Sequence, residues 1–108
     1  MNVVMEQISA VNPDGLKMLA ANYLHDVDLR PIDEAWELAV GVHRGGKHFS
    51  GEPYLIHALE VASTLASMHL DLDTIIAGLL HGSLKNGVRY EELEEKFGRD
   101  VAYIVSGT

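Results

Sequence analysis

The sequence predicts an all-α fold, with short helices joined by short loops. Apolar residues recur every three or four positions, a spacing that places them on one face of a helix. Glycine, proline and aspartate separate these segments, and the alternation of polar and apolar residues that is typical of strands is nearly absent. With 108 residues, 47% of them hydrophobic, the chain can form one packed core but is too short for two ordinary domains. We therefore expect a single helical domain over residues 1–108.

The first two helices are predicted from turn residues and apolar stripes. A turn signal at 12–15 precedes a helix over 16–24, whose stripe consists of Leu16, Leu19, Ala20 and Tyr23. Pro31 suits the first turn of the second helix, which should end at Gly45-Gly46. The stripe of this second helix consists of Ala35, Leu38, Ala39 and Val42.

The middle of the chain predicts a central helix. Pro53 is placed to open a helix that continues over 54–68. Asp71 or Asp73 then caps the next helix, in which the run 74–80 is almost wholly apolar. A helix that is apolar on most sides is buried on most sides, so this one should lie at the centre of the domain.

The last segment predicts two short helices. An acidic helix over 90–97 places Leu93 and Phe97 inward and ends at Gly98, a typical residue after a helix C-terminus. Another helix begins over 99–105. Because the chain stops just after it, we expect these residues to be the N-terminal part of a longer protein.

Charge and composition exclude several classes of function. Eight lysines and arginines stand against sixteen aspartates and glutamates, a net charge of −8. Nucleic-acid binding by this segment is therefore not expected, because phosphate contacts need a basic face. A metal ion can reverse the local charge, so a small phosphorylated ligand stays open. With no cysteine and no run of about 18 apolar residues, we expect no disulfide, no membrane span and a cytoplasmic protein.

Two histidines are candidates for chemistry, because His57 and His81 each lie on a strongly apolar helix. One interpretation is a structural histidine satisfied by a backbone carbonyl. The other is that the two helices pack together and offer two imidazole nitrogens to one metal ion. Such an ion usually has three protein ligands, but Gly82 after His81 has no side chain. Lys85, four residues after His81, would face the same side of a continuous helix and oppose a cation.

Several motifs then follow one another in a recognisable order. They are His43-Arg44-Gly45, Ser50-Gly51-Glu52-Pro53-Tyr54-Leu55-Ile56-His57, Leu59-Glu60-Val61-Ala62, Ala77-Gly78-Leu79-Leu80-His81, the acidic run 90–98 and Val101-Ala102. In this order they resemble the hydrolase domain of the RelA/SpoT family, the stringent-response enzymes that make and degrade guanosine tetra- and pentaphosphate. The resemblance covers about residues 12–108, and it implies an all-helical HD domain, here a partial HD-like bundle.

The resemblance also implies a metal site, and this chain departs from it. The family's metal, typically manganese, is held by a first histidine, a His-Asp pair and a later aspartate. His57 and His81 match the two histidines, whereas Gly82 stands in place of the pair's aspartate. Lys85 and Asn86 stand in place of a Glu-Asp dyad thought to position or activate water. The later aspartate would lie beyond the last residue of the chain.

The nucleotide loop departs as well. The family usually has a basic pair before Ser-Gly-Glu-Pro that contacts the guanine nucleotide, and here His48 and Phe49 occupy these positions, while Ser50 is kept. Losing even one ligand or supporting group typically costs tenfold or more in metal affinity or activity. Gly82 would also cost about 1 kcal/mol in a helix interior, which suggests relaxed constraint or a local break.

Three hypotheses follow. The favoured one is a catalytically inactive pseudo-hydrolase module of a (p)ppGpp synthetase (GTP pyrophosphokinase) of the stringent response, with a structural or regulatory role toward a downstream synthetase domain. It has no catalytic residue and no expected cofactor, although guanine nucleotide binding stays open. The alternative is a residual manganese-dependent (p)ppGpp 3′-pyrophosphohydrolase, with the metal site completed by Asp73, Glu60 or a partner chain. The third is a stand-alone helical interaction module that uses the acidic helix and the C-terminal helix.

Overall fold

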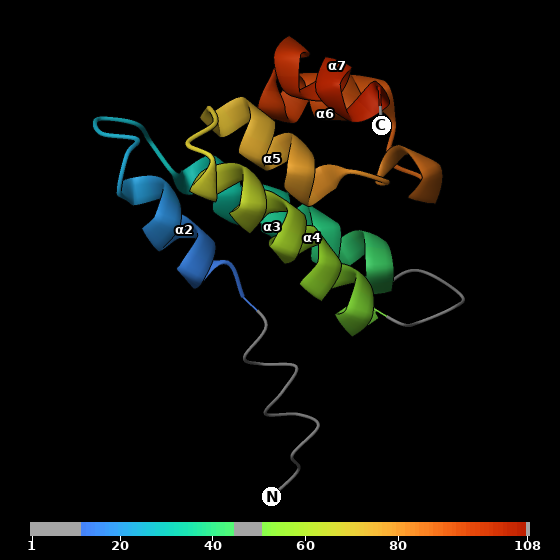
Figure 1. Ribbon diagram of the computed structural model, residues 1–108. Coiled ribbons are helices and arrows are strands. Elements are labelled where there is room, and N and C mark those ends of the chain that lie inside the picture. The colour runs from blue at the N-terminus through green and yellow to red at the C-terminus, as the bar shows by residue number, and fades with distance from the viewer. Residues whose placement is uncertain (1–11, 45–50, 108) are drawn as a thin grey trace, which may run out of the picture.

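The computed structural model describes residues 12–44 and 51–107, with side chains described for 12–42 and 54–107. In these residues it contains helices and no strand (Figure 1), which confirms the predicted all-α fold. The elements in order are α2 (Asp14–Ala21), α3 (Arg30–Arg44), α4 (Gly51–Ser67), α5 (Leu72–Leu80), the 3-10 turn η1 (Leu84–Asn86), α6 (Tyr90–Phe97) and α7 (Arg99–Ser106). None of the helices in these ranges is both long and apolar enough to cross a membrane.

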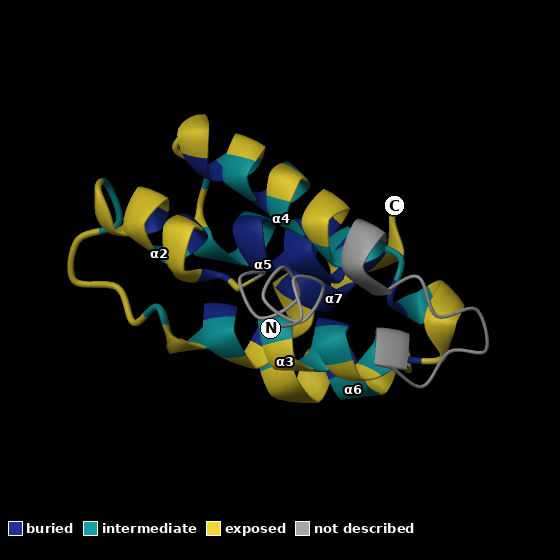
Figure 2. Cartoon of the chain, turned by 90° about the horizontal axis from the view of Figure 1, so that it is seen from below, coloured by how far each residue is buried: buried dark blue, intermediate teal, exposed yellow. Residues whose placement is uncertain are grey.

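Helix α5 lies at the centre of the domain, as its apolar run predicts. It packs against α3, α4 and α7, while α2 packs on α4 and α6 packs on α7. Every residue from Ile75 to Leu80 is buried, and Figure 2 shows α5 enclosed between α3 and α4. Burial of these side chains is the main stabilising contribution, at roughly 25 cal/mol for each Å² of apolar surface removed from water.

The contact between α4 and α5 is close because the facing residues are small. Ala58, Ala62 and Ala66 recur every four residues along one face of α4, and all three are buried. On the other side of the contact, a Cβ added to Gly78 would lie only 2.8 Å from Leu65 Cδ1 and 3.5 Å from the Ala62 Cα. This close approach brings the second turn of α4 near the C-terminal end of α5.

The helix ends agree with the sequence in most places. Asp71 is the N-cap of α5, and its Oδ1 accepts a hydrogen bond of 2.6 Å from Thr74 Oγ1, whereas Asp73 lies in the first turn. Helix α6 has the predicted bounds, and α7 extends one residue beyond the predicted 99–105. The predicted helix end at Gly45-Gly46 lies outside the described residues.

Helix α2 differs from the prediction at both ends. It begins at Asp14 rather than at Leu16, and it ends at Ala21 rather than at residue 24. The end moves because the Asn22 and Tyr23 amides donate to carbonyls only three residues back, which tightens and closes the last turn. Tyr23 nevertheless packs against the core, as its place in the apolar stripe predicts.

Candidate functional site

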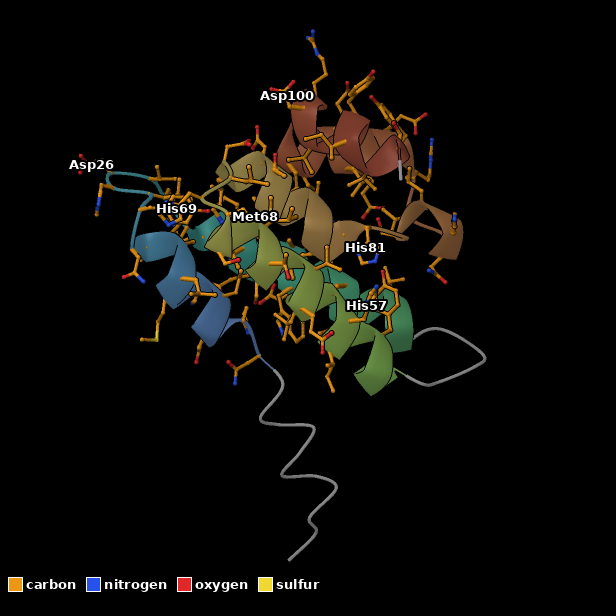
Figure 3. All side chains as sticks on the ribbon, in the orientation of Figure 1. Asp26, His57, Met68, His69, His81 and Asp100 are labelled. Atoms are coloured by element: carbon orange, nitrogen blue, oxygen red, sulfur yellow. The ribbon has the colours of Figure 1, made fainter. Side chains whose placement is uncertain are left out.

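The two candidate ligands, His57 on α4 and His81 directly after α5, lie side by side (Figure 3). Their ring centroids are 5.2 Å apart, and the ring planes meet at 73°. Two imidazoles bound tetrahedrally to one ion, at metal–nitrogen distances of about 2.1 Å, would place their centroids roughly 5 Å apart. The packing of α4 on α5 thus brings together the two histidines that the sequence singled out, at a separation that suits a shared cation.

The imidazole of His81 is oriented by the backbone of its own helix. Its Nδ1 lies 2.7 Å from the Gly78 carbonyl oxygen. A carbonyl oxygen can only accept, so Nδ1 carries a proton, and in the neutral ring the lone pair is then on Nε2. A backbone carbonyl is a common partner for a metal-bound histidine, and it is equally the partner expected for a structural histidine. The two interpretations drawn from the sequence therefore share this geometry.

Tyr54 holds the turn that follows α5. Its hydroxyl donates a hydrogen bond to the His81 carbonyl oxygen, and the two rings stack with centroids 6.1 Å apart. Burial raises the pKa of the Tyr54 hydroxyl, which keeps it protonated and able to donate. The sequence patterns alone gave Tyr54 no separate role. Its place three residues before His57, on the same face of α4, was the available signal.

Gly82 lies in a sharp turn and not in a helix interior, which corrects an expectation from the sequence. Helix α5 ends at Leu80, and Gly82 has a φ of +83°, a left-handed conformation that glycine adopts at low cost. A glycine here stabilises the turn relative to most residues, so the expected cost of about 1 kcal/mol for a glycine in a helix interior does not apply to Gly82. The expected local break is confirmed.

The break also moves the two residues at the dyad positions. Lys85 and Asn86 belong to η1, and both are exposed. The expectation that Lys85 faces the same side as His81 assumed one continuous helix through Gly82, and because α5 ends at Leu80 the spacing of the two residues no longer supports it. Asn86 Nδ2 donates to the Gly82 carbonyl oxygen at 2.8 Å, so this side chain supports the turn.

The described residues supply two candidate ligands and no third. No group of three or more histidine, cysteine, aspartate or glutamate side chains that could hold a metal ion occurs among them. Asp73 lies at the opposite end of α5, eight residues and roughly 12 Å from His81 along the helix. Glu60 lies on α4 but joins no such group. The described residues therefore supply only part of the manganese site that the family resemblance implies. The positions of the nucleotide loop, His48, Phe49 and Ser50, lie outside the described residues.

Comparison with known proteins identifies a family and several relatives. Residues 35–108 match the family model described as "HD domain". The chain is 40% identical over 95 residues to a guanosine-3′,5′-bis(diphosphate) 3′-pyrophosphohydrolase of Vibrio cholerae, covering 87% of this chain and 14% of that protein. It is 40% identical over 97 residues to a GTP pyrophosphokinase of Myxococcus xanthus, covering 89% of this chain and 13% of that protein. It is 36% identical over 95 residues to the bifunctional (p)ppGpp synthase/hydrolase SpoT of Escherichia coli K12, covering 87% of this chain and 14% of that protein. The chain thus spans about a seventh of the length of these relatives.

Proposed function

This chain belongs to the HD-domain family, as an HD domain of the RelA/SpoT family, and on that premise we propose that it is a pseudo-hydrolase module. The relatives are named for making guanosine polyphosphates, for hydrolysing them, or for both. In the proposal the module catalyses nothing. It is carried by a GTP pyrophosphokinase of the stringent response, where it packs against a downstream synthetase domain and influences the state that domain adopts.

The observation that carries this proposal is the ligand set around His81. Two imidazoles lie together, but Gly82 occupies the position of the pair's aspartate and no carboxylate joins them among the described residues. Removing a metal ligand or its supporting group typically lowers affinity or activity by about 10- to 100-fold. The packing around the site is meanwhile intact, since Gly78 and Tyr54 both hold His81 in place.

Calorimetric titration of manganese into the chain tests the proposal. A His57→Ala, His81→Ala double variant serves as the comparison, and His25→Ala, an exposed histidine in a loop, serves as the matched control. We expect no micromolar binding to any of these proteins. Stoichiometric micromolar binding that is lost in the double variant but kept in the control would overturn the proposal.

The variant Gly82→Asp tests whether Gly82 is the reason why the site does not bind manganese. Aspartate tolerates a positive φ better than most residues, and a Cβ at this position would meet the Tyr54 hydroxyl oxygen at 3.2 Å, a contact that a slight shift relieves. We expect manganese affinity to rise about tenfold or more over the parent chain. A variant that remains folded by circular dichroism yet gains no affinity would show that Gly82 is not what disables the site.

A second candidate function is residual manganese-dependent hydrolysis of (p)ppGpp at the 3′ position. It is supported by the 5.2 Å separation of the two rings and by the free Nε2 of His81. It requires a third ligand from another polypeptide or from residues outside the described ones. Pyrophosphate released from ppGpp with manganese, and abolished by His81→Ala, would establish it in place of the inactive module.

A further inference from the structure

A groove of about 660 Å³ is lined by residues of α3, of α6 and of the segment 86–88, and neither His57 nor His81 lines it. The segment 86–88, at the end of η1 and in the turn after it, also lines the groove. Its lining residues are Glu34, Glu37, Leu38, Gly41 and Val42 of α3, Asn86, Gly87 and Val88 of the turn, and Glu92, Lys96 and Phe97 of α6.

The groove has an apolar floor. Leu38, Val42 and Phe97 are half-buried and pack against the core from one side, while their other sides line the groove. Val88 between them is 7% exposed. Aliphatic and aromatic side chains left partly open in a groove favour a ligand that can cover them with apolar groups of its own.

The rim of the groove is acidic. Glu34 and Glu37 are exposed on α3, and neither takes part in the four ion pairs formed among the described side chains. Across the groove, Glu92 is bound to Lys96 with Nζ and Oε2 3.0 Å apart. The lining therefore carries three carboxylates and one ammonium group, a net negative charge. Glu34 also lies near enough to Arg30 to help raise the pKa of that guanidinium, after the larger effect of Asp28.

Gly41 leaves bare backbone within this groove. It lies inside α3, where glycine costs about 1 kcal/mol relative to alanine. A Cβ added to Gly41 would meet nothing within 4 Å, so packing among the described residues does not require a glycine there. The missing side chain instead deepens the groove, which allows another helix to approach α3 closely.

We propose that this groove binds a basic amphipathic helix of a partner protein. Large aliphatic residues at helical spacing would cover Leu38, Val42 and Phe97, and lysine or arginine beside them would face Glu34 and Glu37. A second copy of this chain is disfavoured as the occupant, because its net charge of −8 opposes an acidic rim. Neither His57 nor His81 lines the groove, so the proposal does not depend on whether that pair binds metal.

A synthetic peptide probes the groove directly. The probe is a fluorescein-labelled helix of about 16 leucines and lysines, with leucines at i, i+3, i+4 and i+7. A peptide of the same composition, scrambled so that it has no apolar face, is its control. We expect the amphipathic peptide to bind about tenfold or more tightly than the scrambled one by fluorescence anisotropy, and to weaken between about 0.02 and 0.5 M salt. Amide shifts on binding should gather in α3 and α6. Equal binding of both peptides, or shifts elsewhere, would overturn the proposal.

Two sets of variants separate binding from folding. Gly41→Leu should raise the melting temperature, because leucine is a good helix former. The same side chain should fill the groove and lower the affinity for the amphipathic peptide about tenfold or more. Glu34→Lys with Glu37→Lys should also weaken it, whereas Glu91→Lys with Glu95→Lys, the same charge change outside the groove on α6, should weaken it much less. A stabilised Gly41→Leu chain that binds as well as the parent, or equal losses in both charge pairs, would contradict the proposal. A dimer of the parent chain that Gly41→Leu dissociates would replace the partner helix with a second copy.

Discussion

His81 is fixed at the end of α5 by two hydrogen bonds that involve different parts of the residue. Its ring donates to the Gly78 carbonyl, and its own carbonyl accepts from the Tyr54 hydroxyl. One of the two interpretations drawn from the sequence placed His57 and His81 together, because each lies on a strongly apolar helix and the two helices can pack together. The sequence left open whether the helix breaks at Gly82, because a glycine after a histidine is compatible with a continuing helix as well as with a break.

Gly82 and Gly41 should respond in opposite ways when each is replaced by alanine. Gly82→Ala should lower the free energy of unfolding by about 1 kcal/mol or more, because a side chain at φ +83° is strained. Gly41→Ala, in open space within α3, should raise it by about 0.5–1 kcal/mol. Urea denaturation of both variants measures the two changes. A neutral Gly82→Ala would mean that the turn is not held in the left-handed conformation.

Tyr54 contributes through its hydroxyl. Tyr54→Phe removes the donor to the His81 carbonyl and keeps the ring, so it should lower the free energy of unfolding by about 0.5–1.5 kcal/mol. Thermal melts monitored by circular dichroism would measure the loss. If the hydroxyl also positions the turn, the backbone amide signals of Gly82 and Ser83 should shift in the variant. Unchanged signals would limit Tyr54 to packing.

At the scale of the elements, the apolar patterns predicted most of what the structure contains. The run 74–80 predicted the buried helix α5, and the acidic helix α6 was predicted with its bounds, because Gly98 marks its end clearly. The predictions of helix ends fail where local backbone hydrogen bonds determine whether the helix continues. Helix α2 ends early in a tighter turn, and η1 interrupts what the spacing of His81 and Lys85 presented as one helix. The groove between α3 and α6 was not predicted, because its walls are distant in sequence.

The buried alanines of α4, Ala58, Ala62 and Ala66, indicate that α4 and α5 leave little space between them. Ala62→Leu, at a fully buried position, should lower the free energy of unfolding by about 1–3 kcal/mol through overpacking. Thr64→Leu on the exposed side of the same helix should change it by less than about 0.5 kcal/mol. Chemical denaturation of the two variants provides the comparison. A tolerated leucine at position 62 would mean that α4 and α5 are less closely packed.

At the scale of the whole molecule, excess negative charge is the main electrostatic feature. Asp73 illustrates its effect, because burial, then Asp71 and then Asp100 of α7, all raise the pKa of its carboxyl. A carboxyl whose pKa is higher in the folded state destabilises the fold when it is ionised. The penalty is present at neutral pH and disappears as the pH falls through the folded pKa toward the ordinary value of 3.8.

Asp73→Asn should therefore stabilise the chain at neutral pH. We expect the melting temperature to rise by roughly 1–3 °C at pH 7, the equivalent of a few tenths of a kcal/mol for a partly exposed group. The difference should vanish near pH 3, where the parent carboxyl is protonated as well. Melting curves at both pH values test this, with Asp28→Asn as a contrast, since Arg30 lowers the pKa of Asp28 to about 2. An Asp73→Asn variant less stable than the parent at pH 7 would mean that the charge favours the N-terminus of α5 more than its neighbours oppose it.

The position of α5 between three other helices has a consequence for how this domain changes over evolutionary time. The meeting of His57 and His81 is set by alanines, by a glycine and by a buried apolar run, all of which the core requires for folding. Selection for stability alone thus preserves the arrangement of the pair, even in a lineage that no longer needs its chemistry. In the inactive module proposed above, this arrangement would last for as long as the core is maintained.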